Sequence, residues 1–190
     1  MAAKTALILL IATCLALGWT KDLTDPFILG VELQSGFNDQ VMIEYEAFYI
    51  YENMAAYFSR PEVGLHGFAK FFRKAADEEI EHARKFSEFI NKRNGRVILR
   101  HIVPPGETVP ENFASIKDAI SLAIQKELQV SRSVTSLHLH ASRLNDAQAQ
   151  HFLDDFLTEQ VESTSKLRSM KARLELCDSA AFLMDQELQS

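Results

Sequence analysis

Hydrophobic residues recur alternately three and four positions apart in four long stretches of the chain. This spacing is typical of the buried stripe of an amphipathic helix. A short apolar segment further along predicts a brief fifth helix, so the sequence indicates an all-α fold. The four long stretches cover residues 37–58, 65–89, 113–141 and 153–174, and the short segment covers residues 180–184.

The connections between the stretches indicate how the helices pack. Short turns at residues 61–64 and 145–146 join the first to the second stretch and the third to the fourth, which predicts two antiparallel hairpins. The middle connection, residues 95–112, can extend roughly 59 Å at about 3.3 Å per residue, whereas a 30-residue helix is only about 45 Å long. We therefore predict a four-helix bundle with one long crossover between the second and third helices.

The first 18 residues have a different character. One positive charge in residues 1–4 is followed by the uncharged apolar run 5–17, and Ala16 and Gly18 place small residues just before Trp19. This order is typical of a cleaved secretory signal peptide. A membrane anchor is the weaker alternative, because a span needs roughly 20 apolar residues. We expect secretion, or retention in the lumen of the secretory pathway, and one mature domain at residues 19–190.

Composition narrows the classes of function. Hydrophobic residues make up 47% of the chain and charged residues 24%, as in an ordinary globular domain. The formal net charge of −6 disfavours nucleic acid as a partner and favours cations. Removal of the signal peptide would take Cys14 with it and leave Cys177 alone, which excludes an intrachain disulfide in the mature chain.

Polar residues interrupt the apolar stripe of every long helix. Counted from Glu62 or Asn145 in the nearer hairpin turn, the first interruption of each helix lies 15 to 18 residues away, so their heights differ by only a few ångström at about 1.5 Å per residue. Their side chains are therefore expected to converge at one level inside the bundle. The interrupting residues are Glu44, Glu79 with His82, Glu127, and Gln160.

Carboxylates buried together must protonate or destabilise the core unless cations neutralise them. Carboxylate oxygens with one imidazole suit iron, manganese or zinc. Glu79 and His82 lie one helical turn apart and could share a metal ion with Glu44, while Glu127 and Gln160 could form a second, weaker site.

Each interruption also has a purely structural interpretation. Residues 77–82 could form a solvated charged face, Glu44 could pair with a basic side chain, and Gln160 could be a hydrogen-bonded core amide. Tyr51, two turns after Glu44, fits either a hydrogen bond to a ligand or core packing. The shared phase and height of the five residues favour a metal centre.

Several motifs together resemble those of ferritins. They are MIEYEAFYIY at residues 42–51, FAKFF at 68–72, DEEIEHA at 77–83, GRVIL at 95–99 and EQV at 159–161. The resemblance covers approximately residues 36–188. It implies a heavy-chain-like subunit that oxidises Fe(II) to Fe(III) with dioxygen at a two-iron centre. It further implies storage of ferric oxide inside a hollow octahedral shell of 24 subunits, built from this chain alone or mixed with another ferritin chain, with the last helix lining an axis.

The resemblance also implies roles for the interrupting residues. Glu44, Glu79 and His82 would hold the first iron, with Glu79 bridging to the second. Glu127 would hold the second iron with Gln160 beside it. The remaining catalytic position corresponds to Tyr51, which matches a tyrosine near the iron centre.

Further carboxylates match residues that ferritins use outside the iron centre. Glu78 and Glu81 match carboxylates that pass iron to the mineral or nucleate it, although the next such position is Arg84 here. Asp154 matches the acidic lining of the channel through which iron enters. The stretch 152–160 is one residue shorter than the animal pattern and closer to bacterial ferritins, which leaves Glu159 and Glu162 as candidate ligands of an accessory iron.

Two other classes of protein remain as alternatives. A related di-metal bundle enzyme would be expected to carry a second Glu-x-x-His motif, and none occurs at Glu127 or Glu159. A non-catalytic secreted helical carrier or cytokine-like bundle would have little reason to place five ligand-type residues on its core stripes.

Overall fold

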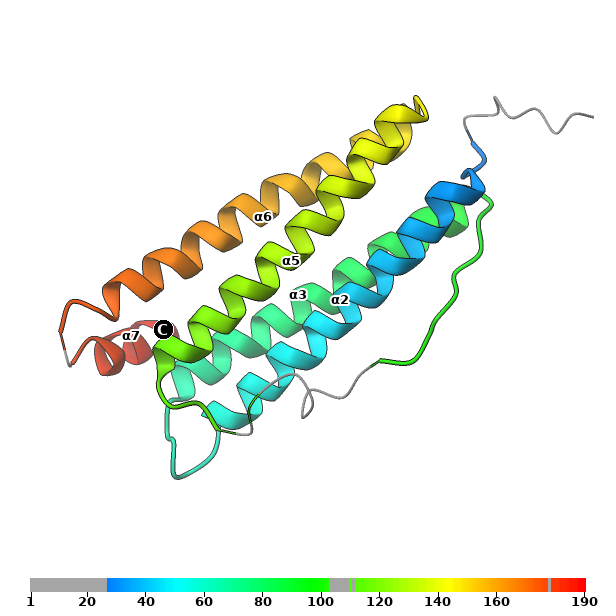
Figure 1. Cartoon of the computed structure of the whole chain (residues 1–190). Coiled ribbons are helices and arrows are strands. Elements are labelled where there is room, and N and C mark those ends of the chain that lie inside the picture. Colours follow the sequence, from blue (N-terminus) through cyan, green and yellow to red (C-terminus); the bar gives the residue numbers. More distant parts are fainter. Residues whose placement is uncertain (1–26, 103–109, 111, 178) are drawn as a thin grey trace, which may run out of the picture.

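The computed structural model describes residues 27–102, 110, 112–177 and 179–190, and this part of the chain contains helices but no strand (Figure 1). Four long helices form a bundle and a short fifth helix follows, as the hydrophobic pattern predicts. The helices are α2 (Val31–Phe58), α3 (His66–Lys92), α5 (Ile116–Arg143), α6 (Ala147–Arg173) and α7 (Ala180–Gln189).

The long helices pack as two antiparallel hairpins, α2 with α3 and α5 with α6, and α2 also packs against α5. Helices α3 and α5 run in the same direction, because the connection between them, as far as residue 102, runs back along the bundle from the end of α3 (Figure 1). Its described part lies against α2: the Asn38 amide donates to the Arg96 carbonyl at 3.0 Å and accepts from the Ile98 N–H at 2.6 Å. The predicted long crossover is confirmed.

The start of the third long helix differs from the prediction. Phe113 has the phase of the helical stripe, yet α5 begins at Ile116. Ser115 is the N-cap, and its hydroxyl accepts a hydrogen bond from the Asp118 N–H at 3.2 Å. Phe113 lies before the helix and is buried against the rings of Tyr57 and Phe58.

Other differences extend the predicted helices. Helix α2 begins at Val31, ahead of the predicted start at residue 37, and α3 continues to Lys92, beyond the predicted end at residue 89. Helix α6 begins at Ala147, ahead of the first residue of its stripe, because the Asp146 carboxylate caps it by accepting from the Ala149 N–H at 2.9 Å. Helix α7 continues beyond Met184 to Gln189.

A layer of buried polar residues divides the core into two apolar clusters. The cluster nearer the α2–α3 turn contains Met54, Phe58, Phe72 and Ile120 among its residues. The other cluster lies towards the α5–α6 turn. Along each long helix the polar residue of the sequence pattern falls between the two clusters, so the polar layer crosses the bundle at a single level. The second cluster includes Phe37, Phe86, Val134 and Leu153.

Candidate metal centre

The polar layer brings together three side chains from two antiparallel helices. Glu44 on α2 and Glu79 and His82 on α3 each offer a ligand atom, and these atoms all lie within 4.8 Å of one another. Glu79 and His82 share one face of α3 because they are one turn apart, and Glu44 faces them across the helix pair. Two carboxylates and an imidazole in this arrangement can hold a divalent or trivalent transition-metal ion.

The other two interrupting residues lie in the same layer. Glu127 on α5 and Gln160 on α6 are buried and line the same cavity as Glu79 and His82. The Tyr51 hydroxyl donates a hydrogen bond to Glu127 Oε1 from α2. Tyr51 is thus both part of the core and a partner of a candidate ligand. We refer to these candidate ligands together as the metal centre; they are Glu44, Glu79, His82, Glu127 and Gln160.

Neighbouring side chains orient the ligands. The Gln40 amide donates to Glu44 Oε1 at 2.7 Å. His82 lies between two carboxylates, with Nε2 2.9 Å from Glu159 Oε2 and Nδ1 3.5 Å from Glu79 Oε2. If Nε2–H donates to Glu159, the lone pair of Nδ1 points into the metal centre, which is the tautomer that a metal ligand needs.

Several buried oxygens of the centre have no hydrogen-bond partner among the described residues: Glu44 Oε2, Glu79 Oε2 and Gln160 Oε1. A buried polar atom without a partner is costly, and a bound cation would compensate that cost. These oxygens come from three helices and belong to the metal centre. The donor set therefore fits a hard cation such as iron.

Burial is the largest cause of the raised pKa values of Glu44 on α2 and Glu79 on α3. Loss of solvation, followed by repulsion from Glu79, holds the pKa of Glu44 well above its ordinary value. Loss of solvation, followed by the Glu127 carboxylate, raises the pKa of Glu79 to about 8. Without a cation, the centre therefore retains protons near neutral pH, and a bound cation would replace them.

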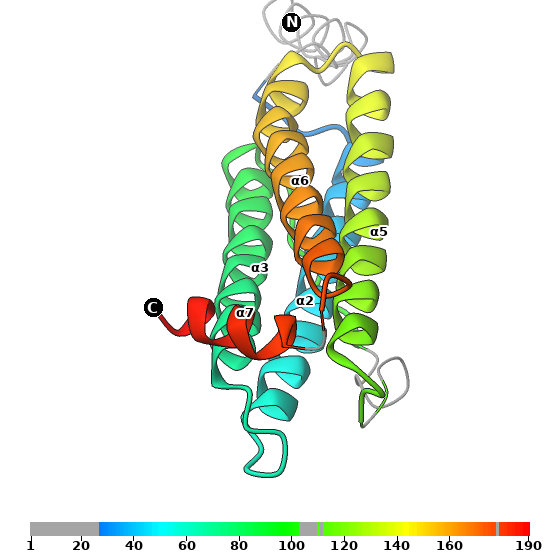
Figure 2. The ribbon, with the colours of Figure 1, turned by 90° about the vertical axis from the view of Figure 1, so that its left-hand side faces the viewer.

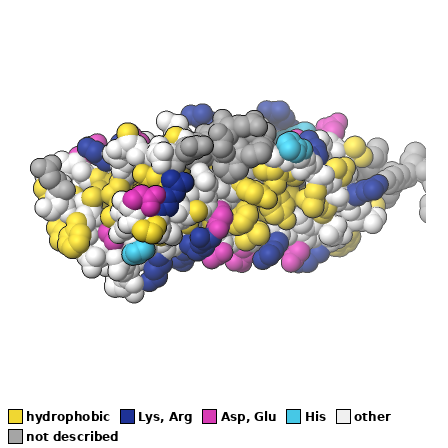
Figure 3. Space-filling model, turned by 90° about the horizontal axis from the view of Figure 1, so that it is seen from below, with side chains coloured by type: hydrophobic (Ala, Val, Ile, Leu, Met, Phe, Trp, Pro, Cys, Tyr) yellow, Lys and Arg dark blue, Asp and Glu magenta, His cyan; other side chains and the backbone are white. Residues whose placement is uncertain are grey.

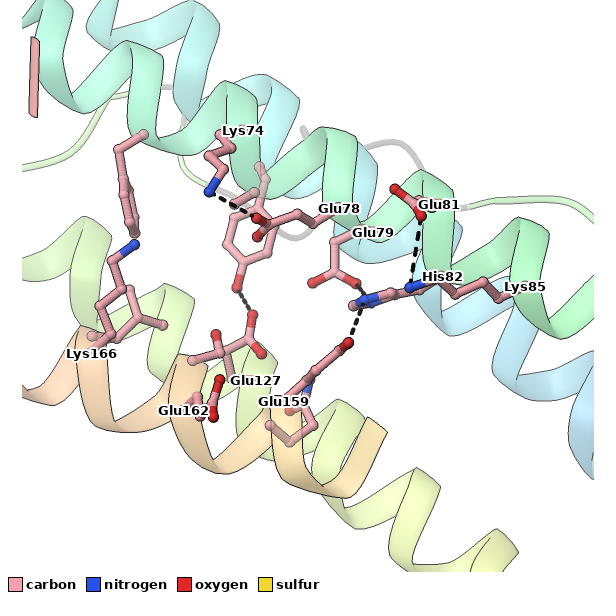
Figure 4. Close-up of a pocket in the computed structure, with 16 residues that line it drawn as sticks. Lys74, Glu78, Glu79, Glu81, His82, Lys85, Glu127, Glu159, Glu162 and Lys166 are labelled. Carbon is pink, nitrogen blue, oxygen red and sulfur yellow. Dashed lines mark hydrogen bonds and ion pairs between the residues drawn. The ribbon is translucent and has the colours of Figure 1, made fainter. Parts of the chain in front are cut away.

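The metal centre opens to the surface through a cavity of about 390 Å³ between α3 and α6 (Figure 4). Exposed carboxylates surround the opening, and Lys74, Lys85 and Lys166 lie beside them. The four carboxylates outnumber the three ammonium groups, which leaves the opening slightly anionic and favours the approach of cations from this side. We call these carboxylates the cavity mouth; they are Glu78, Glu81, Glu159 and Glu162.

Asp154 lies apart from this arrangement. It is exposed on α6, and its Oδ1 is 3.2 Å from Nε2 of His138 on α5. Within a single chain, Asp154 therefore contributes to neither the metal centre nor the cavity mouth.

Two residues near the centre are not marked by the hydrophobic pattern. Gln40 is fully buried and orients Glu44; its position four residues before Glu44, on the same face of the helix, is a signal that could have found it. Lys126 is buried beside Glu127 between α2 and α5. No sequence signal marks Lys126, because a lysine among polar neighbours normally lies in solvent.

Comparison with known proteins gives a consistent result. The family model for the ferritin-like domain matches residues 34–177. The chain is 40% identical over 149 residues to a chloroplastic ferritin of Malus baccata var. xiaojinensis and 38% identical over 151 residues to one of Phaseolus vulgaris. These alignments cover 75% and 76% of this chain but only 58% of each relative.

A crayfish relative is matched over more of its length. The chain is 35% identical over 156 residues to a ferritin of Pacifastacus leniusculus, covering 80% of this chain and 84% of the relative. The family match spans α3, α5 and α6, all of α2 except its first three residues, and every residue of the metal centre. The chain belongs to the ferritin family.

Proposed function

We propose that this ferritin stores iron and oxidises it at the metal centre, taking Fe(II) and dioxygen as substrates and yielding Fe(III). The observation that carries the proposal is the buried group formed by Glu44, Glu79 and His82, whose ligand atoms lie within 4.8 Å of one another. Family membership supports iron as the metal, and the names of the relatives support storage.

The residues divide between two iron positions. Glu44, Glu79 and His82 bind the first iron, and Glu79 also reaches the second, which Glu127 and Gln160 hold. Each position has two carboxylates, but the second has the weakly binding amide of Gln160 where the first has the His82 imidazole, and Glu127 also accepts a hydrogen bond from Tyr51. We therefore propose that the second position binds iron more weakly and helps to release product. Carboxylate oxygens favour Fe(III) over Fe(II), which assists the loss of one electron from each iron to dioxygen.

Oxidised iron leaves through the cavity mouth and is deposited as a ferric oxide mineral. Glu78 and Glu81 are exposed beside the centre and receive it first, and Glu159 and Glu162 form an accessory site on the α6 side. Storage requires an enclosed space, so we propose that copies of this chain, alone or with another ferritin chain, assemble into the hollow 24-subunit shell typical of the family.

Secretion remains a separate proposal. It depends on residues 1–18, which lie outside the described residues. Among the described residues, no helix has the length and apolar character required to cross a bilayer. Membership of the ferritin family argues against the cytokine-like alternative.

The test is aerobic addition of Fe(II) to metal-free protein while near-ultraviolet absorbance follows Fe(III). A variant carrying both Glu79→Ala and His82→Ala removes two ligands of the first iron. The matched control is Glu88→Ala on the same helix, which removes an exposed carboxylate that pairs with Lys92 at 3.5 Å outside the cavity. Size-exclusion chromatography with light scattering measures the assembly of all three proteins.

We expect fast oxidation by the wild type and by Glu88→Ala, and oxidation near the buffer rate by the double variant at unchanged size. Wild-type oxidation no faster than buffer would refute the ferroxidase proposal. Equal rates for the wild type and the double variant would place the oxidation elsewhere in the protein.

A further inference from the structure

Lys126 is a buried lysine on α5 that immediately precedes Glu127 of the metal centre in the sequence. Its side chain is only 5% exposed, and its Nζ lies 3.5 Å from Glu46 Oε2 and 3.4 Å from Gln129 Oε1. A buried ammonium group is costly unless it is well paired. Glu46 is 36% exposed, so solvent screens its carboxylate more than the buried ammonium group, and part of the positive field of Lys126 remains inside the bundle.

The position of Lys126 is opposite to the opening of the cavity. Glu46 lies on α2, so Lys126 occupies the contact between α2 and α5, whereas the cavity opens between α3 and α6. The two sides of the metal centre therefore differ in the depth of their charges. On the α2–α5 side, a buried ammonium group is paired with the partly exposed Glu46. On the other side, the four carboxylates of the cavity mouth are exposed, with Lys74, Lys85 and Lys166 beside them (Figure 4).

The field of Lys126 extends to the ligands of the centre. Burial and the Glu127 carboxylate raise the pKa of Glu79, whereas the neighbouring Glu44 carboxyl and the positive charge of Lys126 oppose this rise. A charge that stabilises the Glu79 carboxylate must also repel a cation bound to it. The repulsion increases with the charge of that cation and is therefore greater for Fe(III) than for Fe(II).

We infer that Lys126 is a fixed positive charge behind the metal centre that weakens cation binding there and directs iron to arrive and leave through the cavity mouth. This inference rests on the proposed function. It assigns to Lys126 a role in releasing the product: the residue repels the trivalent product more strongly than the divalent substrate, while the carboxylates of the cavity mouth attract both.

Titration of metal-free protein with Co(II), a redox-stable stand-in for Fe(II), tests the inference by absorbance and calorimetry. Lys126→Met removes the charge while keeping a long apolar chain, and Lys126→Arg keeps the charge. Glu46→Gln removes the negative partner of Lys126 and leaves its positive field less compensated. All three substitutions lie outside the ligand set.

We expect Lys126→Met to bind Co(II) about threefold to tenfold more tightly than the wild type, the effect of one partly screened charge. We expect Lys126→Arg to match the wild type and Glu46→Gln to bind more weakly. A merely structural role for Lys126 would instead weaken binding in both Lys126→Met and Glu46→Gln. The opposite signs of these two variants therefore distinguish an electrostatic role from a structural one.

Unchanged or weaker Co(II) binding by folded Lys126→Met would overturn the inference. Circular dichroism and chromatographic size establish folding; if Lys126→Met does not fold, an unchanged or tighter affinity of Glu46→Gln overturns it instead. Failure of the proposed function has a different signature, since wild-type protein would then bind Co(II) no better than the double variant Glu79→Ala, His82→Ala.

Discussion

Glu79 is the residue on which most interactions of the metal centre converge. Its Oε2 lies 3.5 Å from His82 Nδ1, and it belongs with Glu44 and His82 to the group whose ligand atoms lie close enough to hold one metal ion. Glu127 is the nearby charge that raises its pKa most. Burial and Glu127 raise its pKa to about 8, so the carboxyl is largely protonated at neutral pH in the metal-free protein. A metal ion that binds to Glu79 near neutral pH would therefore have to displace a proton from it.

The raised pKa of Glu79 predicts how stability depends on pH. In the unfolded chain this carboxyl titrates near 4.5, and in the folded protein near 8. Because the folded state binds this proton more tightly than the unfolded chain, protonation stabilises the fold. This stabilisation is complete below the pKa of the unfolded chain and is lost as pH rises through the pKa of the folded protein. We expect Glu79→Gln, which cannot ionise, to match metal-free wild type near pH 4 and to exceed it near pH 9 by on the order of a few kcal/mol.

Urea unfolding of both metal-free proteins at equal concentration, repeated from about pH 4 to pH 9, measures this difference. Glu88→Gln, an exposed carboxylate on the same helix, is the control and should change little at any pH. A stability difference between Glu79→Gln and wild type that does not change with pH would show that Glu79 does not titrate in this range.

At the residue scale, the sequence could predict the candidate ligands because they violate a pattern. A carboxylate on an apolar stripe must face the core, so the phase of Glu44, Glu79 and Glu127 is enough to place them inside the bundle. Lys126 violates no stripe. Its burial depends on how closely α2 and α5 approach, which one helix pattern does not contain.

At the scale of elements, α7 caps the N-terminal end of α3. The residue that precedes α3, Leu65, provides no side-chain cap, but Asp185 of α7 accepts a hydrogen bond from the Phe68 N–H at 3.0 Å. An N-terminal helix end has unpaired N–H groups that favour an anionic oxygen. Helix α7 lies across this end of the bundle (Figure 2), and Gly67 allows its backbone to approach closely.

Gly67→Ala should therefore displace α7. A Cβ at position 67 would lie 1.9 Å from the backbone oxygen of Asp185, so one of the two segments must move. We expect a loss of about 1–3 kcal/mol in unfolding free energy and faster proteolysis within residues 180–189. Gly30→Ala is the control, because a Cβ there meets nothing within 4 Å. Equal proteolysis of the two variants would contradict the proposed contact.

Local signals determine how much of each element could be predicted. The caps Ser115 and Asp146 are recognisable in the sequence, and they account for the observed starts of α5 and α6. The predicted start of the third helix at Phe113 is wrong, because an apolar residue with the phase of the helical stripe can also pack against the core from a loop. The cap that Asp185 provides to α3 comes from 117 residues away, so only the tertiary structure reveals it.

At the scale of the whole molecule, the single chain leaves large apolar side chains in solvent. Tyr49, Ile98 and Leu99 are 44%, 48% and 64% exposed, and apolar side chains gather between charged ones on the face seen in Figure 3. The bonds between Asn38 and the crossover fix residues 96–98 against α2. Exposed apolar side chains on a rigid segment are typical of a protein–protein contact.

The sequence predicted the bundle and its crossover, because hydrophobic periodicity and connection length determine both. It could not identify which outer surfaces contact other copies. Helix periodicity reports the side that faces the bundle core, whereas Ile98 and Leu99 belong to an irregular segment without a period. The structure therefore adds a specific position at which assembly can be tested.

Leu99→Arg is expected to break the proposed shell while leaving each subunit folded. A charge placed in an apolar contact loses its hydration without gaining a partner, so association should weaken strongly. Light scattering should report a smaller assembly, with unchanged circular dichroism, while Leu99→Met keeps the wild-type size. Co(II) binding should survive in Leu99→Arg, because all five residues of the metal centre come from one chain.

Iron oxidation and iron retention should then separate in Leu99→Arg. The dissociated subunits would still oxidise Fe(II) but would release ferric oxide that precipitates, because no enclosed space holds the mineral. Soluble mineral retained by small subunits would refute the shell as the storage compartment. An unchanged assembly of Leu99→Arg would exclude Leu99 from the contacts and direct the search to the exposed apolar residues of α7, Phe182 and Leu183.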